Sequence, residues 1–100
     1  MLLLTRTGLI LILLSFGASA RDLSQDEALR LREQGLIVPL EQVLTLVDAR
    51  YPDASLLEVE LEEEEGVYIY EVELATKTGL VRELEIDATS GKILQDEVDD

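Results

Sequence analysis

The pattern of apolar and polar residues changes its period once along the chain. From Leu40 to Tyr51 the apolar residues recur every three or four positions, which predicts an amphipathic helix with Pro39 in its first turn. From Leu57 onward apolar residues alternate with acidic ones, which is typical of strands with one apolar and one polar face. The sequence therefore predicts a helix followed by a sheet.

Three strands and a short fourth are expected in the second half of the chain. They comprise 57–62, 68–74, a strand containing Leu84 and Ile86, and 92–94. Because only short turns separate these strands, neighbours should pair antiparallel. The helix should then cover the apolar face of the sheet. We expect an α+β fold: N-terminal helices followed by a three- to four-stranded antiparallel meander sheet covered on one face by one helix.

A shorter helix should precede this unit. Ser24-Gln25-Asp26-Glu27 has the capping-box pattern, and Gly35 is a typical helix stop. The apolar residues between them form no continuous stripe, so this helix should be marginal on its own. We assign residues 21–37 to this short helical segment, 38–95 to the main domain and 96–100 to an acidic tail with nothing to bury.

Residues 1–20 follow the order of a secretory signal peptide. Arg6 precedes an apolar run that starts at Gly8, and Ala18-Ser19-Ala20 provides the small residues of a cleavage site. The apolar run is shorter than the roughly 20 residues that span a bilayer, which disfavours a permanent anchor. We expect cleavage at about Ala20 and a periplasmic or secreted protein without a membrane anchor afterwards.

Composition excludes several classes of function. The chain has 22 Asp and Glu against 8 Lys and Arg, a net charge of -14, which argues against nucleic-acid binding. It contains no Cys and no His, so thiolate or imidazole catalysis and zinc sites are excluded. An open sheet also lacks the cleft in which paired carboxylates cleave glycosides. We expect no enzyme activity, no catalytic residue and no cofactor.

The unusual chemical feature is a set of glutamates on the predicted polar side of the sheet. By alternation they should share the face opposite the helix: Glu58, Glu60, Glu62, Glu71, Glu73, Glu83 and Glu85. The simplest interpretation is a solvated face that maintains solubility and discourages edge pairing. Docking of a basic partner, or weak binding of divalent cations, are the alternatives. Crowding of like charges should raise the pKa values of these carboxyls.

Two segments after the predicted helix resemble the PepSY domain. One is the strand Tyr68-Ile69-Tyr70-Glu71-Val72-Glu73-Leu74, and the other is Ile86-Asp87-Ala88-Thr89-Ser90-Gly91-Lys92-Ile93-Leu94. The resemblance implies a non-catalytic module of exported proteins, found in propeptides of thermolysin-like metalloproteases and as free-standing domains. A role in restraining proteases is proposed for that family. Tyr68, Tyr70, Asp87 and Gly91 match it as structural positions, and no catalytic residue is carried over.

These observations lead to one functional expectation and one alternative. We expect an exported binding module that regulates or inhibits a protease or an envelope sensor by protein-protein contact. The alternative is an acidic periplasmic protein that binds divalent cations or cationic peptides weakly. Both leave the oligomeric state open.

Overall fold

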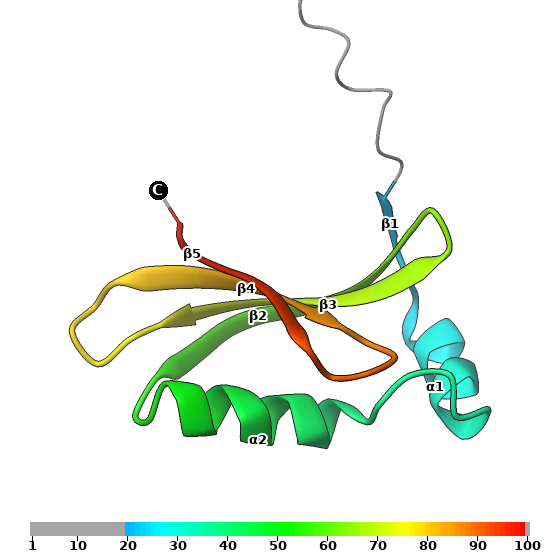
Figure 1. Ribbon diagram of the computed structural model, residues 1–100, viewed down its shortest axis with the longest axis horizontal. Coiled ribbons are helices and arrows are strands. Elements are labelled where there is room, and N and C mark those ends of the chain that lie inside the picture. The colour runs from blue at the N-terminus through cyan, green and yellow to red at the C-terminus, as the bar shows by residue number, and fades with distance from the viewer. Residues whose placement is uncertain (1–19, 100) are drawn as a thin grey trace, which may run out of the picture.

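The computed structural model describes residues 20–99. Residues 1–19, which hold nearly all of the predicted signal peptide, and Asp100 lie outside the described residues. The elements in chain order are β1 (Ala20–Asp22), α1 (Gln25–Glu33), α2 (Leu40–Arg50), β2 (Ser55–Glu64), β3 (Val67–Ala75), β4 (Val81–Asp87) and β5 (Ile93–Val98). Figure 1 shows a curved sheet with α2 along one face and α1 near the end where β1 lies.

The five strands form one sheet in the order β1-β2-β3-β4-β5, and all neighbours are antiparallel. This confirms the α+β class and the meander, with five strands in place of the expected three to four. The additional pairing comes from β1 before the helices. The expected short closing strand is also longer than predicted.

β1 is a three-residue strand that pairs with the end of β2. Ala20 lies opposite Glu64 and Asp22 opposite Glu62. The guanidinium of Arg21 contacts a Glu63 carboxylate oxygen at 2.9 Å and Glu27 at 3.2 Å. Ala-Arg-Asp has no apolar alternation, so the sequence pattern gave no sign of a strand here. Backbone pairing and these ion pairs hold it in place.

The prediction that residues 96–100 form an acidic tail with nothing to bury is wrong, because β5 continues to Val98. Asp96 lies on the helix side of the sheet, opposite Leu84, with a side chain 10% exposed. Its carboxylate accepts hydrogen bonds from Tyr51 at 2.5 Å and from Arg50 and Arg82 at 2.8 Å each. A carboxylate that receives three hydrogen bonds can be buried at low cost.

These donors also determine how Asp96 titrates. Burial by itself raises the pKa of the Asp96 carboxyl. The hydrogen bonds from Tyr51 and the two arginines outweigh burial and hold that pKa below its ordinary value. Asp96 is therefore ionised at neutral pH and joins the C-terminal end of α2 to β4 and β5.

The expectation that the Leu57 side chain lies on the apolar face of the sheet is also wrong. The register shifts between Leu56 and Glu58, so that Leu56 pairs with Leu74 and Leu57 occupies a β-bulge. Leu57 is 52% exposed. One extra residue in β2 therefore moves the apolar position from Leu57 to Leu56, whereas Val59 and Leu61 keep the expected direction.

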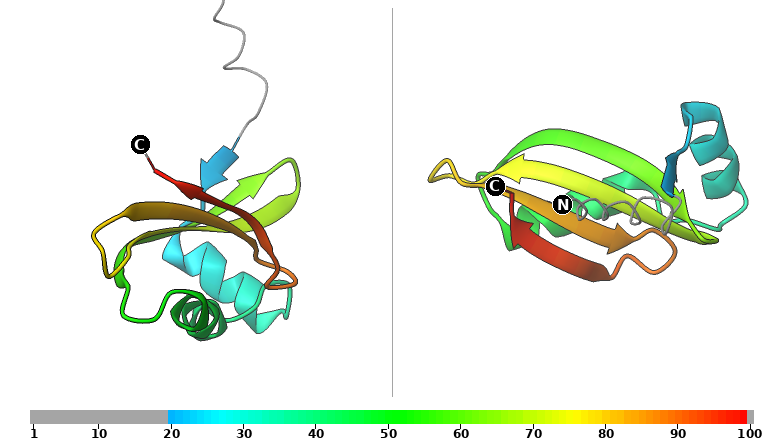
Figure 2. Two further views of the ribbon diagram at one scale, coloured as in Figure 1. Left: turned by 60° about the vertical axis from the view of Figure 1, so that its left-hand side comes forward. Right: turned by 90° about the horizontal axis from the view of Figure 1, so that it is seen from above.

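The core lies between α2 and the sheet. Val43 and Val47 of α2 are nearly inaccessible to solvent, and four sheet residues have 0% exposure: Val72, Leu74, Leu84 and Ile86. Figure 2 shows that α2 runs beneath the sheet, whose other face carries no helix among the described residues. The expectation that one helix covers the apolar face is confirmed.

Helix α1 is attached more loosely. Ser24 and Glu27 form the expected capping box, and Gly35 ends the helical segment at φ +75°. No residue of α1 is fully buried, and Leu29 is 46% exposed. The sequence prediction of a marginal helix that leans on its neighbours fits these values. Neither helix within residues 20–99 has the length and apolar character needed to cross a bilayer.

Candidate functional site

The strand register places the seven predicted glutamates on one face of the sheet. We call this set, Glu58, Glu60, Glu62, Glu71, Glu73, Glu83 and Glu85, the acidic face. Four cross-strand pairs join two of its members directly: Glu58 with Glu73, Glu60 with Glu71, Glu71 with Glu85 and Glu73 with Glu83. Residues opposite one another in a sheet project to the same side. The acidic face is therefore continuous across β2, β3 and β4.

The register adds further acids that the alternation of residues did not predict for this face. Asp22 lies opposite Glu62, and Glu97 lies opposite Glu83. Both belong to parts of the sheet that the sequence pattern did not predict, namely β1 and the second half of β5. The acidic surface consequently extends over all five strands.

No cation neutralises the acidic face within residues 20–99. The acids in the ion pairs of the described residues are Glu27, Glu41, Glu63 and Asp96. None of these belongs to the acidic face. Carboxylates directly opposite one another across strands repel. The acidic face thus costs folding free energy unless protons, salt or a cationic partner reduce its charge.

Glu71 shows this cost most clearly, because it lies in the middle of the acidic face. Its burial, together with the charges of Glu62 and Glu83, raises the pKa of Glu71 to about 7. Ile69, two positions earlier on the same face, is 8% exposed and lies outside the main core. Glu71 is therefore partly protonated at neutral pH.

Four other carboxyls on the acidic face also have raised pKa values. Burial raises the pKa of Glu62 and of Glu85, and neighbouring acids add to it. A hydrogen bond with Glu58, followed by the charge of Asp22, raises the pKa of Glu60. A hydrogen bond with Asp99 is the main cause for Glu73. The predicted effect of crowding is confirmed in direction for these residues.

Three acids at the β1 end of the acidic face come close enough to share a cation. Oxygens of Asp22, Glu60 and Glu62 lie within 4.8 Å of one another. Carboxylate oxygens are the ligands that hard divalent cations prefer. Exposed acids commonly gather in this way without an ion, so the geometry permits a weak site and no more.

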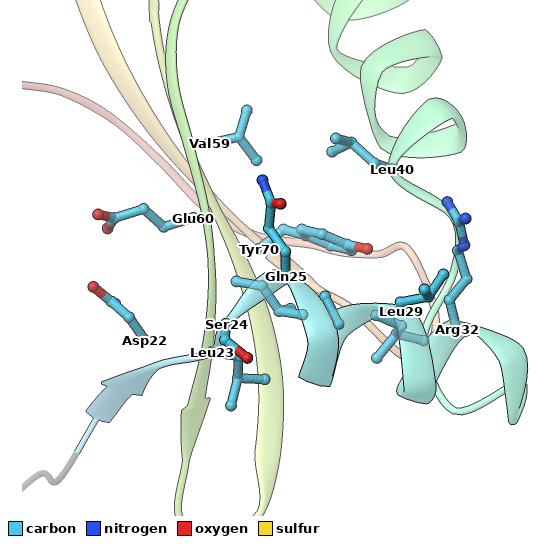
Figure 3. Close-up of a pocket in the computed structure, with 13 residues that line it drawn as sticks. Asp22, Leu23, Ser24, Gln25, Leu29, Arg32, Leu40, Val59, Glu60 and Tyr70 are labelled. Carbon is cyan, nitrogen blue, oxygen red and sulfur yellow. The ribbon is translucent and has the colours of Figure 1, made fainter.

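An apolar groove lies on the other side of β2, between the sheet and the two helices. It has a volume of about 580 Å³, and its lining includes Leu23, Leu29, Leu40, Val59 and Tyr70. In Figure 3 these side chains lie on one side of β2, whereas Asp22 and Glu60 project from the opposite side. The same stretch of β2 therefore borders an apolar groove on one face and carboxylates on the other.

Polar residues also line this groove, among them Ser24, Gln25, Arg32 and Tyr70. The Tyr70 hydroxyl donates to the Val38 carbonyl at 2.8 Å, so it serves packing. Burial raises the pKa of this phenol. Arg32 lies at the rim and contacts Glu41 at 3.7 Å. Seven of the thirteen lining residues are apolar, so the groove can accept an apolar side chain. The residue pattern gave no sign of the groove because it forms between separate elements.

The four family-matched positions have structural roles. Tyr70 is buried on the helix side, and Tyr68, two positions earlier in β3, lies on the same face. Asp87 accepts hydrogen bonds from the amides of Thr89 at 2.8 Å and Ser90 at 3.2 Å. Gly91 has φ +82°, which glycine adopts readily. The interpretation of 87–91 as a turn is confirmed.

Comparison with known proteins places the chain in a family. Residues 37–97 match PepSY, the "Peptidase propeptide and YPEB domain". The match covers more than half of the chain, so the chain belongs to the PepSY family. Domains of this family are generally non-catalytic, are typically extracellular or periplasmic, and are associated with protease propeptides or their regulation.

A curated relative provides a second comparison. The chain is 46% identical over 46 residues to "Uncharacterized protein YkoJ" of Bacillus subtilis (strain 168). That alignment covers 46% of this chain and 27% of the relative, so it spans about a quarter of the relative's length. No solved structure gives a significant match.

Proposed function

We propose that the protein is an exported, non-catalytic PepSY module that regulates or inhibits a protease, or an envelope sensor, by protein-protein contact. The observation that carries this proposal is the acidic face, which is continuous over β2, β3 and β4 and has no ion-pair partner within the described chain. A basic surface on a partner would relieve its repulsion on binding. Membership of the PepSY family supports a protease as the first partner to test.

Electrostatic attraction of this kind has a recognisable signature. Opposite fields speed association more than they deepen affinity, and salt weakens them over a Debye length of about 10 Å at 0.1 M. The association rate should therefore fall steeply as salt rises. The dissociation rate should change less.

The test uses extracellular proteases and sensor ectodomains encoded beside this gene. Each is assayed for binding and for inhibition at about 0.05 M and about 0.5 M NaCl. The variant E60Q/E71Q/E73Q removes three charges from the acidic face, and D26N/E33Q/D48N removes three from exposed helix positions. The proposal expects the first variant to bind at least about fivefold more slowly than the second.

Equal association rates for the two variants would contradict a role for the acidic face. So would binding that is as fast at high salt as at low salt. Cleavage of a substrate by the purified protein would contradict the non-catalytic assignment.

The second candidate function is weak binding of divalent cations. The specific observation in its favour is the approach of Asp22, Glu60 and Glu62 to within 4.8 Å. Calorimetry with Ca²⁺ and Mg²⁺ separates the candidates, since cation binding needs measurable heat that is lost in E60Q/E62Q. Absence of heat at millimolar cation leaves the partner function alone.

A further inference from the structure

One edge of β2 is open from Ser55 to Glu60 within the described residues. β1 pairs with residues 62–64, and the Leu23 amide donates to the Leu61 carbonyl at 2.9 Å. Beyond that point the chain turns away into α1, and no strand within residues 20–99 pairs with Ser55 to Glu60 on this side. An unpaired strand edge offers amide and carbonyl groups to another chain.

The direction of these backbone groups follows from the Leu23 contact. Alternate residues of a strand direct their N–H and C=O groups to the same edge, so Val59 presents its groups where Leu61 does. Leu23 pairs with Leu61 and packs against the core on the helix side. A residue that pairs with Val59 in the same antiparallel sense would likewise direct its side chain to the helix side.

Apolar space is available on that side. Val59 borders the 580 Å³ groove, whose walls include Leu29 and Leu40. Leu56 borders a second groove of about 380 Å³ beside Leu44 of α2. Leu56 and Val59 are three positions apart in β2, but the bulge at Leu57 makes them pair with β3 residues only two positions apart. Two residues of an incoming strand with the same spacing would therefore reach the two grooves.

The other side of the same edge is acidic. Glu58 and Glu60 project there, because they pair with Glu73 and Glu71 of the acidic face. Asp22 lies close to Glu60, as Figure 3 shows. No cation among residues 20–99 pairs with Glu58 or Glu60. A strand added here would therefore place alternate side chains in apolar grooves and the intervening ones beside carboxylates.

We propose that the open edge of β2 binds an extended segment of a partner protein in which apolar and basic residues alternate, paired antiparallel to β2 and in line with β1. This inference rests on the proposed function, that the protein acts by contact with another protein, and it specifies the surface and the partner's chemistry. A second copy of this chain is a poor occupant. Antiparallel pairing of two β2 edges would bring Glu58 and Glu60 against the same acids of the copy.

The test uses the protein purified from cells that express the full chain, and a capped peptide, Lys-Val-Lys-Val-Lys-Val. Its affinity is compared with that of a peptide of the same composition in two blocks, Lys-Lys-Lys-Val-Val-Val. Both peptides have the same charge, so long-range attraction is equal. The alternating peptide should bind at least about tenfold more tightly, because strand addition needs the period of two.

N-methylation of the peptide tests the hydrogen bonds without changing the protein. In the proposed pairing the valine amides face β2 and the lysine amides face solvent. Methylating the amide of the central valine should weaken binding at least about tenfold, and methylating the neighbouring lysine amide less than about threefold. Equal effects of the two methylations would overturn the proposed edge pairing.

Two matched pairs of protein variants locate the site. E58Q/E60Q should weaken the alternating peptide by about fivefold, and E83Q/E85Q, with the same loss of charge on β4, by clearly less. L29Q places an amide in the groove and should weaken binding about threefold, whereas L80Q, a similarly exposed leucine in the β3–β4 turn, should not. Equal loss in the two glutamate variants would place the peptide on the open face and overturn the inference.

The outcomes separate this inference from the proposed function. A natural partner that binds with the expected salt dependence but unchanged by E58Q/E60Q or L29Q would support the function and overturn the edge. If the protein forms a concentration-dependent dimer that L29Q abolishes, the open edge binds a second copy of this chain. That result would also overturn the inference.

Discussion

Asp96 and Glu71 lie on opposite faces of the same sheet and show how its two sides use acids. Asp96, on the helix side, accepts three hydrogen bonds from Tyr51 and two arginines, and its pKa is lowered. Glu71, on the acidic face, is surrounded by other glutamates, and its pKa is raised to about 7. One acid stabilises the fold, and the other is tolerated at a cost.

The largest expected effect comes from removing Asp96. Asp96→Ala leaves the Tyr51 hydroxyl and the Arg82 guanidinium without their acceptor and should destabilise the protein by about 2 kcal/mol. Urea unfolding at pH 7 measures this. The matched variant Glu97→Ala removes the neighbouring, exposed acid and should cost nothing. Equal stability of the Asp96→Ala variant and the parent would contradict the role of Asp96.

The next effect is a rise of stability at mildly acidic pH. Because folding raises the pKa of Glu71 and of four neighbours, the folded state binds more protons than the unfolded chain between about pH 4.5 and 7. The cost of these ionised carboxyls to the free energy of folding is full above pH 7 and is relieved as the pH falls. The Tm should rise by about 3–6 °C from pH 8 to pH 5.5.

Asp96 sets the lower limit of this window. Its pKa is lowered, so its contribution is present above the ordinary aspartate value and is lost as the pH falls below it. The Tm should therefore pass through a maximum and decline below about pH 4. Calorimetric scans at half-unit steps of pH would show this, and a Tm that is flat or falling from pH 8 to 5.5 would contradict it.

Glu71→Gln should isolate one residue of the acidic face. The substitution removes a partly buried charge while keeping the shape, so the Tm at pH 8 should rise by about 2–4 °C, and the gain should disappear near pH 5. Glu33→Gln, on the exposed side of α1, is the matched control and should change the Tm little at either pH. A gain of the same size for both variants would mean that net charge, not the position of Glu71, is responsible.

The smallest effect is that of salt on the free protein. Raising NaCl from about 0.05 M to 0.5 M should increase the Tm by about 1–3 °C, because it screens repulsion across the sheet. The triple variant E60Q/E71Q/E73Q should lose most of this response, and D26N/E33Q/D48N should keep it. If D26N/E33Q/D48N lost the salt response and E60Q/E71Q/E73Q kept it, the repulsion would not lie on the acidic face.

The sequence predicted the acidic face correctly because alternation fixes which side of a strand each residue occupies. Glu58, Glu71 and Glu83 come from three strands, yet the period alone brought them to one surface. Alternation gave the wrong side for Leu57, because a bulge inserts one residue without any signal in the pattern.

Features that depend on contacts between distant segments were not predicted. The partners of Asp96 lie on α2 and β4, so its acidic neighbourhood in the sequence indicated a solvated tail. β1 lacks an apolar alternation, and the groove beside Val59 forms only where β1, α1 and β2 meet. The open edge of β2 exists because β1 is only three residues long. The length of β1 could not be predicted from the pattern of apolar and polar residues.

Titration of the side-chain carboxyls by NMR tests the contrast between the two faces most directly. A protein labelled at the carboxyl carbons of Asp and Glu is followed from about pH 2 to pH 9. We expect a midpoint near 7 for Glu71 and a midpoint below the ordinary aspartate value for Asp96. A Glu71 midpoint close to that of an isolated glutamate would contradict this contrast. It would mean that burial and the neighbouring carboxylates do not disfavour the charge of Glu71.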